Sequence, residues 1–99
     1  MAAKTPVPVD RYVVDTLMRD LVGHDRRPSA FLVYLAIAAE TQGGARGLSY
    51  AELAEMTGLS RRSAQNAVGH LAHRRLIEVN RTGPTETVLY RALAPWRRA

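Results

Sequence analysis

Cysteine is absent from the chain, and its absence excludes several kinds of chemistry. The 99 residues can form no disulfide, no thiolate-ligated zinc or iron–sulfur site and no thiol nucleophile. The short motifs of serine hydrolases, zinc proteases and phosphate-binding loops are also missing. We therefore expect a protein that is not an enzyme and that has no cofactor and no small-molecule ligand.

Long hydrophobic runs are missing as well. The longest apolar stretch, residues 30–39, has ten residues, whereas a membrane span needs about 20. The first residues lack the apolar segment of a signal peptide. We expect a cytoplasmic protein without a membrane partner.

Lysine is nearly absent, so arginine supplies the positive charge. Thirteen of the 14 basic residues are Arg, and the formal net charge is +5. Residues 1–59 carry six basic and seven acidic side chains, whereas residues 60–99 carry eight basic and two acidic ones, which gives −1 and +6. This asymmetry predicts a polyanion-binding surface in the C-terminal part of the chain.

The apolar and capping patterns predict one domain in which helices precede a β-hairpin. Ser49 and Glu52 have the spacing of a capping box, Ser60 can cap a second short helix, and Gly58 lies in the turn between the two. Alternating residues on both sides of a turn at 82–84 indicate the hairpin. In chain order we expect a flexible arm at 1–9, a helix at 10–22 capped by Asp10 and ended by Gly23, an apolar core helix at 29–42, the helix pair at 49–75, the hairpin at 76–93 and a tail at 94–99.

This order of elements resembles the winged helix-turn-helix DNA-binding domain of bacterial transcription regulators. The resemblance covers residues 29–93 and is carried by residues 48–63 (LSYAELAEMTGLSRRS) and 71–79 (LAHRRLIEV). It does not distinguish MarR-like regulators, metal-sensing repressors and replication initiators. It implies a mainly α fold with a small β-hairpin wing, double-stranded DNA binding and a homodimer. Members of the family often have Gly where this chain has Arg75, so either the recognition helix ends differently or the Arg has another role, such as a phosphate contact.

The polar face of helix 61–74 carries side chains that suit base recognition. Arg can bind guanine through two hydrogen bonds, and Gln or Asn can bind adenine in the same way. We expect Arg62, Gln65 and Asn66 to read bases in the major groove. The full set of expected DNA contacts, including phosphate contacts from the helix starts and the wing, is Ser49, Tyr50, Ser60, Arg61, Arg62, Ser63, Gln65, Asn66, His70 and Arg81.

Two histidines on the same helix do not make a metal site. His70 and His73 are three residues apart, but neither Cys nor a nearby carboxylate accompanies them on that face. A structural or sensing site needs three or four ligands. We therefore expect no bound metal.

The N-terminal half offers more apolar surface than one small domain needs. Helices 10–22 and 29–42 are both rich in aliphatic residues, and a large exposed apolar patch usually marks an interface. We expect a homodimer through these helices, with two-fold contacts and a palindromic DNA site whose half-sites lie about one helical turn apart. The expected interface residues are Val14, Leu17, Met18, Leu21, Tyr34 and Trp96.

Other interpretations use the same surface. An Arg-rich helix face can be a solvated surface without a ligand. The DNA-binding surface also fits a plasmid or phage replication or partition protein. A winged helix can instead serve as a protein–protein interaction module that binds an acidic partner. A steep salt dependence of duplex binding separates the DNA-binding interpretations from this last one.

Overall fold

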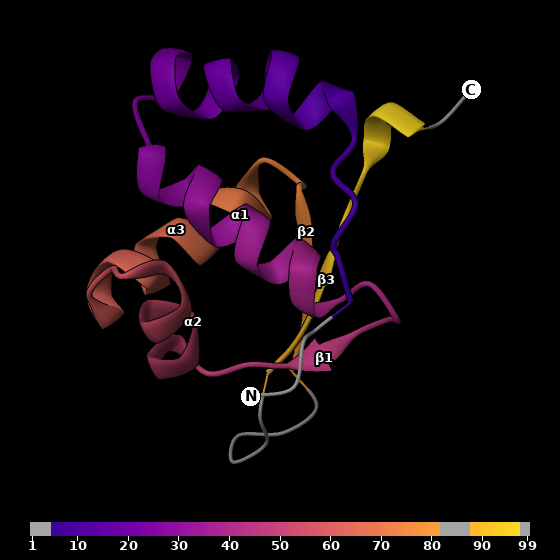
Figure 1. Cartoon of the computed structure of the whole chain (residues 1–99). Helices are drawn as coiled ribbons and strands as arrows, with labels where there is room; N and C mark the ends of the chain where they lie inside the picture. The colour runs from indigo at the N-terminus through magenta and orange to yellow at the C-terminus, as the bar shows by residue number, and fades with distance from the viewer. Residues whose placement is uncertain (1–4, 82–87, 98–99) are drawn as a thin grey trace.

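The described part of the chain is mainly helical, with a small antiparallel sheet on one side (Figure 1). It comprises residues 5–81 and 88–97 of a computed structural model. Its helices are the π-helical stretches Val13–Leu17 (η1) and Asp20–His24 (η2), the α-helices Pro28–Glu40 (α1), Tyr50–Thr57 (α2) and Arg61–His73 (α3), and the 3₁₀-helix Pro95–Arg97 (η3). Its strands are Arg46–Gly47 (β1), Ile77–Asn80 (β2) and Leu89–Ala92 (β3), in the sheet order β1-β3-β2. The expected class, mainly α with a β-hairpin, is confirmed at this level.

The N-terminal helix, residues 11–24, contains η1 and η2 and runs past its predicted end. Gly23 does not end it, because the backbone continues in wide π turns in which the Asp25 amide donates to the Asp20 carbonyl at 2.8 Å. Val13, Leu17 and Leu21 form its buried ridge. The polar link before α1 is therefore shorter than the sequence predicts.

The core helix α1 lies at the centre of the domain, as its apolar sequence predicts. Pro28 occupies its first turn, where the missing amide proton costs nothing. The N-terminal helix covers one side of α1, and α2 and α3 lie on the other (Figure 1). The buried core consists of Val13, Leu17, Leu21, Ala30, Phe31, Val33, Tyr34, Ile37, Leu48, Leu53, Ala54, Ala64, Ala67, Val68, Leu71, Leu76, Ile77 and Tyr90.

The two short helices α2 and α3 begin at side-chain caps. The Ser49 hydroxyl accepts a hydrogen bond from the Glu52 amide, and the Glu52 carboxylate accepts one from the Ser49 amide, both at 3.0 Å. This reciprocal pair confirms the predicted capping box. Gly58 ends α2 with φ of 79°, a left-handed conformation that glycine adopts without steric cost. The Ser60 hydroxyl then accepts from the Ser63 amide at 3.0 Å and starts α3.

Directly after α3, the chain passes through an arginine whose backbone has the left-handed conformation. Arg75 has φ of 58° at the position where glycine is usual, and the next amide, of Leu76, donates to the Leu71 carbonyl at 2.9 Å. The chain then enters β2, which pairs with β3 so that Val79 lies opposite Tyr90. The predicted hairpin strands are therefore present, whereas their predicted turn at 82–84 lies outside the described residues.

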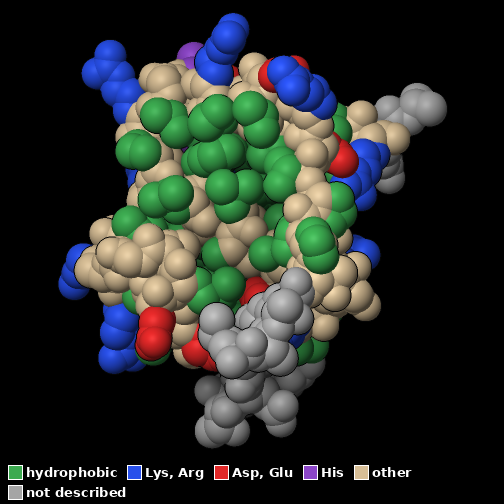
Figure 2. Space-filling model, viewed as in Figure 1, with side chains coloured by type: hydrophobic (Ala, Val, Ile, Leu, Met, Phe, Trp, Pro, Cys, Tyr) green, Lys and Arg blue, Asp and Glu red, His purple; other side chains and the backbone are tan. Residues whose placement is uncertain are grey.

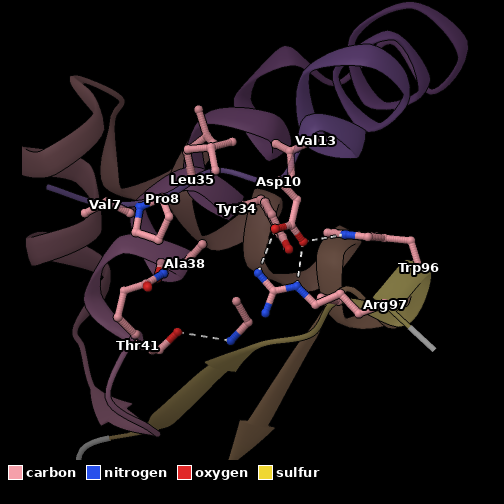
Figure 3. A pocket seen from close by; sticks show the side chains of 14 residues that line it. Val7, Pro8, Asp10, Val13, Tyr34, Leu35, Ala38, Thr41, Trp96 and Arg97 are labelled. Carbon is pink, nitrogen blue, oxygen red and sulfur yellow. Dashed lines mark hydrogen bonds and ion pairs between the residues drawn. The ribbon is translucent and has the colours of Figure 1, made fainter. Parts of the chain in front are cut away.

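The start of the N-terminal helix and the C-terminal η3 meet beside α1, where Asp10 lies against Trp96 and Arg97 (Figure 3). Trp96 stacks on Tyr12 with ring centroids 4.7 Å apart, and its indole Nε1 donates to Asp10 at 2.9 Å. Arg97 also donates to the Asp10 carboxylate, at 2.9 Å from Nη2 to Oδ1. The hydrogen bonds from Arg97 and then Trp96 lower the pKa of Asp10. The Asp10 side chain thus binds the tail and does not act as the predicted helix cap.

A small pocket lies between the segment before the N-terminal helix, η3 and α1. Figure 3 shows its polar groups directed at one another, and Thr41 in its wall accepts a hydrogen bond from the Ala92 amide at 3.2 Å. Among the described residues, no buried side-chain nitrogen or oxygen lacks a hydrogen-bond partner. The buried polar side chains around the pocket are therefore paired, and their contacts hold η3 against the start of the N-terminal helix.

Candidate nucleic-acid interface

Helix α3 has one buried face and one exposed polar face. Ala64, Ala67, Val68 and Leu71 are buried, which confirms the predicted core side of the helix. Ser63 and His70 are half-buried at the edges of this buried face. The exposed residues of the helix are Arg61, Arg62, Gln65, Asn66, Gly69, Ala72 and His73. Because the buried face is fully packed, the exposed side chains project from a fixed helix.

His70 is half-buried, and it borders the groove on the exposed face of α3 while it also contacts the segment that follows the N-terminal helix. Its side chain is only 17% exposed, and its Nε2 lies 2.7 Å from an oxygen of Asp25. Asp25 follows directly after the N-terminal helix. The ring is therefore part of a contact that attaches α3 to that helix.

Asp25 is the centre of this attachment. Its carboxylate is 8% exposed, forms an ion pair with Arg74 and lies 3.0 Å from Nδ1 of His24. Arg74 also binds Asp20, at 3.1 Å. Burial alone raises the pKa of Asp25, but hydrogen bonds from His24, His70 and Arg74 outweigh it and lower the pKa to about 2. The carboxylate therefore remains charged and holds the C-terminal half of α3.

An open groove runs along the exposed face of α3. Gln65, Asn66 and His73 line it from the helix, and Tyr50 lines it from the start of α2. Arg27, from the link before α1, lines the same groove. This arginine was not among the expected contacts, because it lies outside every periodic segment. The structure thus brings a cation from residue 27 to the side chains that were expected to read bases.

The remaining expected contacts lie at the two helix starts and on the hairpin. Ser49 and Ser60 are exposed and use their oxygens as caps, so each hydroxyl still has its proton to donate. Ser63 and Tyr50 are half-buried, and Arg81 is exposed at the end of the described part of the hairpin. Burial is the main cause that raises the pKa of Tyr90 to about 12, and the neighbouring Tyr50 also raises it. The positive charge of Arg81 lowers the pKa of Tyr90 by a smaller amount.

The expected dimer interface is wrong for three of its residues. Leu17, Leu21 and Tyr34 are 3%, 0% and 3% exposed, because they pack within their own chain. Trp96 stacks on Tyr12 of the same chain. Val14 and Met18 are exposed, as is Val22, which was not among the expected interface residues.

No group of three or more His, Asp or Glu side chains in residues 5–81 and 88–97 is placed to hold a metal ion. Within the same ranges, no helix has the length and apolar character required to cross a membrane.

Comparison with known proteins adds no relative. No family model, curated protein sequence or solved structure matches the chain.

Proposed function

We propose that this chain is a winged helix-turn-helix domain that binds double-stranded DNA with sequence specificity, as a small cytoplasmic regulator of transcription. The supporting observation is that α3 buries its apolar face in the core and exposes Arg62, Gln65 and Asn66 together on its polar face. These side chains have the donors and acceptors that recognise guanine and adenine edges in the major groove. The β2–β3 hairpin, with Arg81, would lie on the backbone or in the minor groove.

The charge distribution supports the same function. Four of the six net positive charges of residues 60–99, from Arg61, Arg62, Arg74 and Arg75, lie in α3 or directly after it, whereas the charges of the hairpin segment 76–93 cancel. A polyanion attracted to this surface would meet α3 first. A replication or partition protein would use the same surface, whereas a protein-interaction module would need an acidic partner.

Selection of bound sequences from a random duplex library tests the proposal. At about 150 mM salt, where exposed charges are partly screened, we expect enrichment of a defined site. The logarithm of the binding constant should also fall with the logarithm of salt by about 0.9 for each phosphate that the protein neutralises. Weak binding without an enriched sequence would instead favour the protein-interaction module.

The proposal includes a homodimer formed by the N-terminal helix. Figure 2 shows hydrophobic side chains gathered over this helix and α1. Val14, Met18 and Val22 are 48%, 37% and 39% exposed and line one shallow hollow with Asp15 and Arg19. In an antiparallel pair of these helices, Asp15 of each copy would face Arg19 of the other copy, which gives two equivalent contacts. The surface is therefore complementary in charge to a second copy of itself.

Charge reversal tests this arrangement. Asp15→Arg alone, or Arg19→Asp alone, should weaken self-association about tenfold, because two attractive pairs become repulsive at roughly 1 kcal/mol or less each. An equimolar mixture of the two variants should associate as tightly as the wild type, since every contact is again between opposite charges. Sedimentation velocity across a concentration series measures both effects.

The matched control is Glu55→Arg, which makes the same charge change at an exposed position of α2. It should leave self-association unchanged. A mixture that associates no better than either single variant would exclude the antiparallel pairing. A wild-type chain that is monomeric at micromolar concentration would exclude the homodimer.

A further inference from the structure

Two arginines hold a backbone conformation that side chains rarely adopt. Arg26 and Arg75 have φ of 57° and 58°, and they are the non-glycine residues with positive φ in the described ranges. The left-handed region brings Cβ close to the following carbonyl, so glycine or asparagine is favoured there. Glycine at either position would relieve the crowding. The arginines are therefore retained at a cost to stability, and a backbone outlier of this kind points to function.

The two strained arginines lie at one place in the fold. Arg26 directly follows Asp25, and Arg75 directly follows Arg74, and Asp25 and Arg74 form an ion pair with each other. Arg27, the next residue after Arg26, lines the groove along α3. Three exposed arginines therefore surround the C-terminal end of α3, and we call Arg26, Arg27 and Arg75 the basic cluster.

The basic cluster is available to an external anion. No ion pair in residues 5–81 and 88–97 involves any of its three side chains. The nearest carboxylates along the chain are already paired, since Asp25 is bound by Arg74 and Glu78 is bound by Arg91. The cluster therefore has a positive charge that its neighbours in this part of the structure do not neutralise.

The length of α3 places charges at two separate points. From Arg61 to His73 the helix rises about 18 Å, and the major groove of DNA is about 12 Å wide. A helix that lies across the groove therefore reaches both phosphate backbones with its ends. Arg61 and Arg62 stand at the N-terminal end, where the helix dipole also favours phosphate. At the C-terminal end the dipole disfavours phosphate, so a contact there needs added cations.

The geometry points to a second phosphate-binding site at this end of α3. The basic cluster binds the backbone of one DNA strand, while Arg61 approaches the backbone of the other strand across the major groove and leaves Arg62 to read a base. This inference rests on the proposed DNA-binding function and adds to it that the domain contacts the phosphate backbones of both DNA strands. The partner is the sugar–phosphate backbone, so the cluster contributes affinity and position without reading sequence.

Arg75→Gly tests the inference because its two expected effects have opposite signs. Relief of the left-handed strain should raise Tm by about 4 °C. Loss of a phosphate contact should weaken binding to the selected duplex several-fold and lower the salt slope by about 1. Arg26→Gly should behave in the same way, which keeps the test sound if one variant folds poorly. Titrations of a labelled duplex at four salt concentrations give affinity and slope.

Two control variants separate charge from conformation. Arg75→Lys retains both the charge and the strain, so the salt slope and Tm should match the wild type. Arg11→Ala removes one exposed charge from the N-terminal helix and should leave the slope unchanged. If the wild type binds the duplex and both glycine variants keep its slope, the basic cluster does not contact DNA. If the wild type itself fails to bind, the proposed function is wrong.

Discussion

Replacing Asp25 by asparagine is expected to lower the free energy of unfolding by about 2 kcal/mol near neutral pH. The carboxylate is 8% exposed, and it receives hydrogen bonds from His70 and Arg74 of α3. Breaking a buried charged contact leaves the remaining partners poorly satisfied, which is why the loss exceeds that of a surface pair. Urea unfolding followed by circular dichroism measures the difference.

The pH dependence identifies the cause of this loss. Because the folded-state pKa of Asp25 lies at about 2, below its ordinary value of 3.8, its contribution is complete above pH 5 and declines as the pH falls toward 2. The wild type should therefore lose its advantage over Asp25→Asn across that interval. A difference that stayed constant from pH 5 to pH 2 would contradict the assigned role of the carboxylate.

A matched surface variant completes the comparison. Glu78→Gln removes a carboxylate that is 56% exposed and pairs with Arg91 at 3.1 Å across the β2–β3 pair. Such exposed pairs contribute about 0.5 kcal/mol. Its stability should therefore stay close to that of the wild type, provided that both chains are compared at the same concentration.

Local patterns in the sequence predicted the parts of the fold that depend on neighbouring residues. The capping box at Ser49, the cap at Ser60 and the buried side of α3 all follow from spacings of three or four residues. The sequence also marks Arg75 as the place where glycine is usual, but it leaves open whether the helix ends differently there, and the structure shows the left-handed conformation. The caps and the buried side of α3 form within one or two turns of backbone, so a single sequence contains enough information to predict them.

Contacts between distant segments were not predicted. His70 and Asp25 are 45 residues apart, and Trp96 and Asp10 are 86 residues apart. Whether a polar side chain faces solvent or a distant partner depends on where the segments meet, and no periodicity encodes that. For this reason the sequence does not show that His70 contacts Asp25, that Asp10 binds Trp96 and does not cap the helix, or that Arg27 lies in the groove along α3.

The dimer surface shows the same limit for apolar residues. The i, i+4 spacing predicts two adjacent ridges on the N-terminal helix, but it does not say which one packs inward. The Val13, Leu17 and Leu21 ridge is buried, and the Val14, Met18 and Val22 ridge is exposed. The three-dimensional packing against α1 decides between them.

Arg62→Ala is expected to weaken binding to the selected DNA site by about 1–3 kcal/mol, or roughly 5- to 150-fold. Arg62 is exposed in the first turn of α3, where a helix in the major groove meets the bases. Its guanidinium can donate two hydrogen bonds to guanine O6 and N7. Loss of both should relax the preference at one position of each half-site, and the same library selection reads out that change.

Arg62→Lys distinguishes base recognition from attraction to phosphate. Lysine retains the charge but cannot form the planar two-bond contact with guanine. If Arg62 reads a base, the lysine variant should lose the preference at that position and keep the salt slope, whereas a phosphate contact would keep both. Asn66→Ala is the companion variant, because it should relax a preference for adenine and leave the guanine position intact. Unchanged affinity and unchanged site preference in Arg62→Ala would remove this residue from the recognition surface, and the assignment would then pass to Gln65 and Asn66, which share the exposed face.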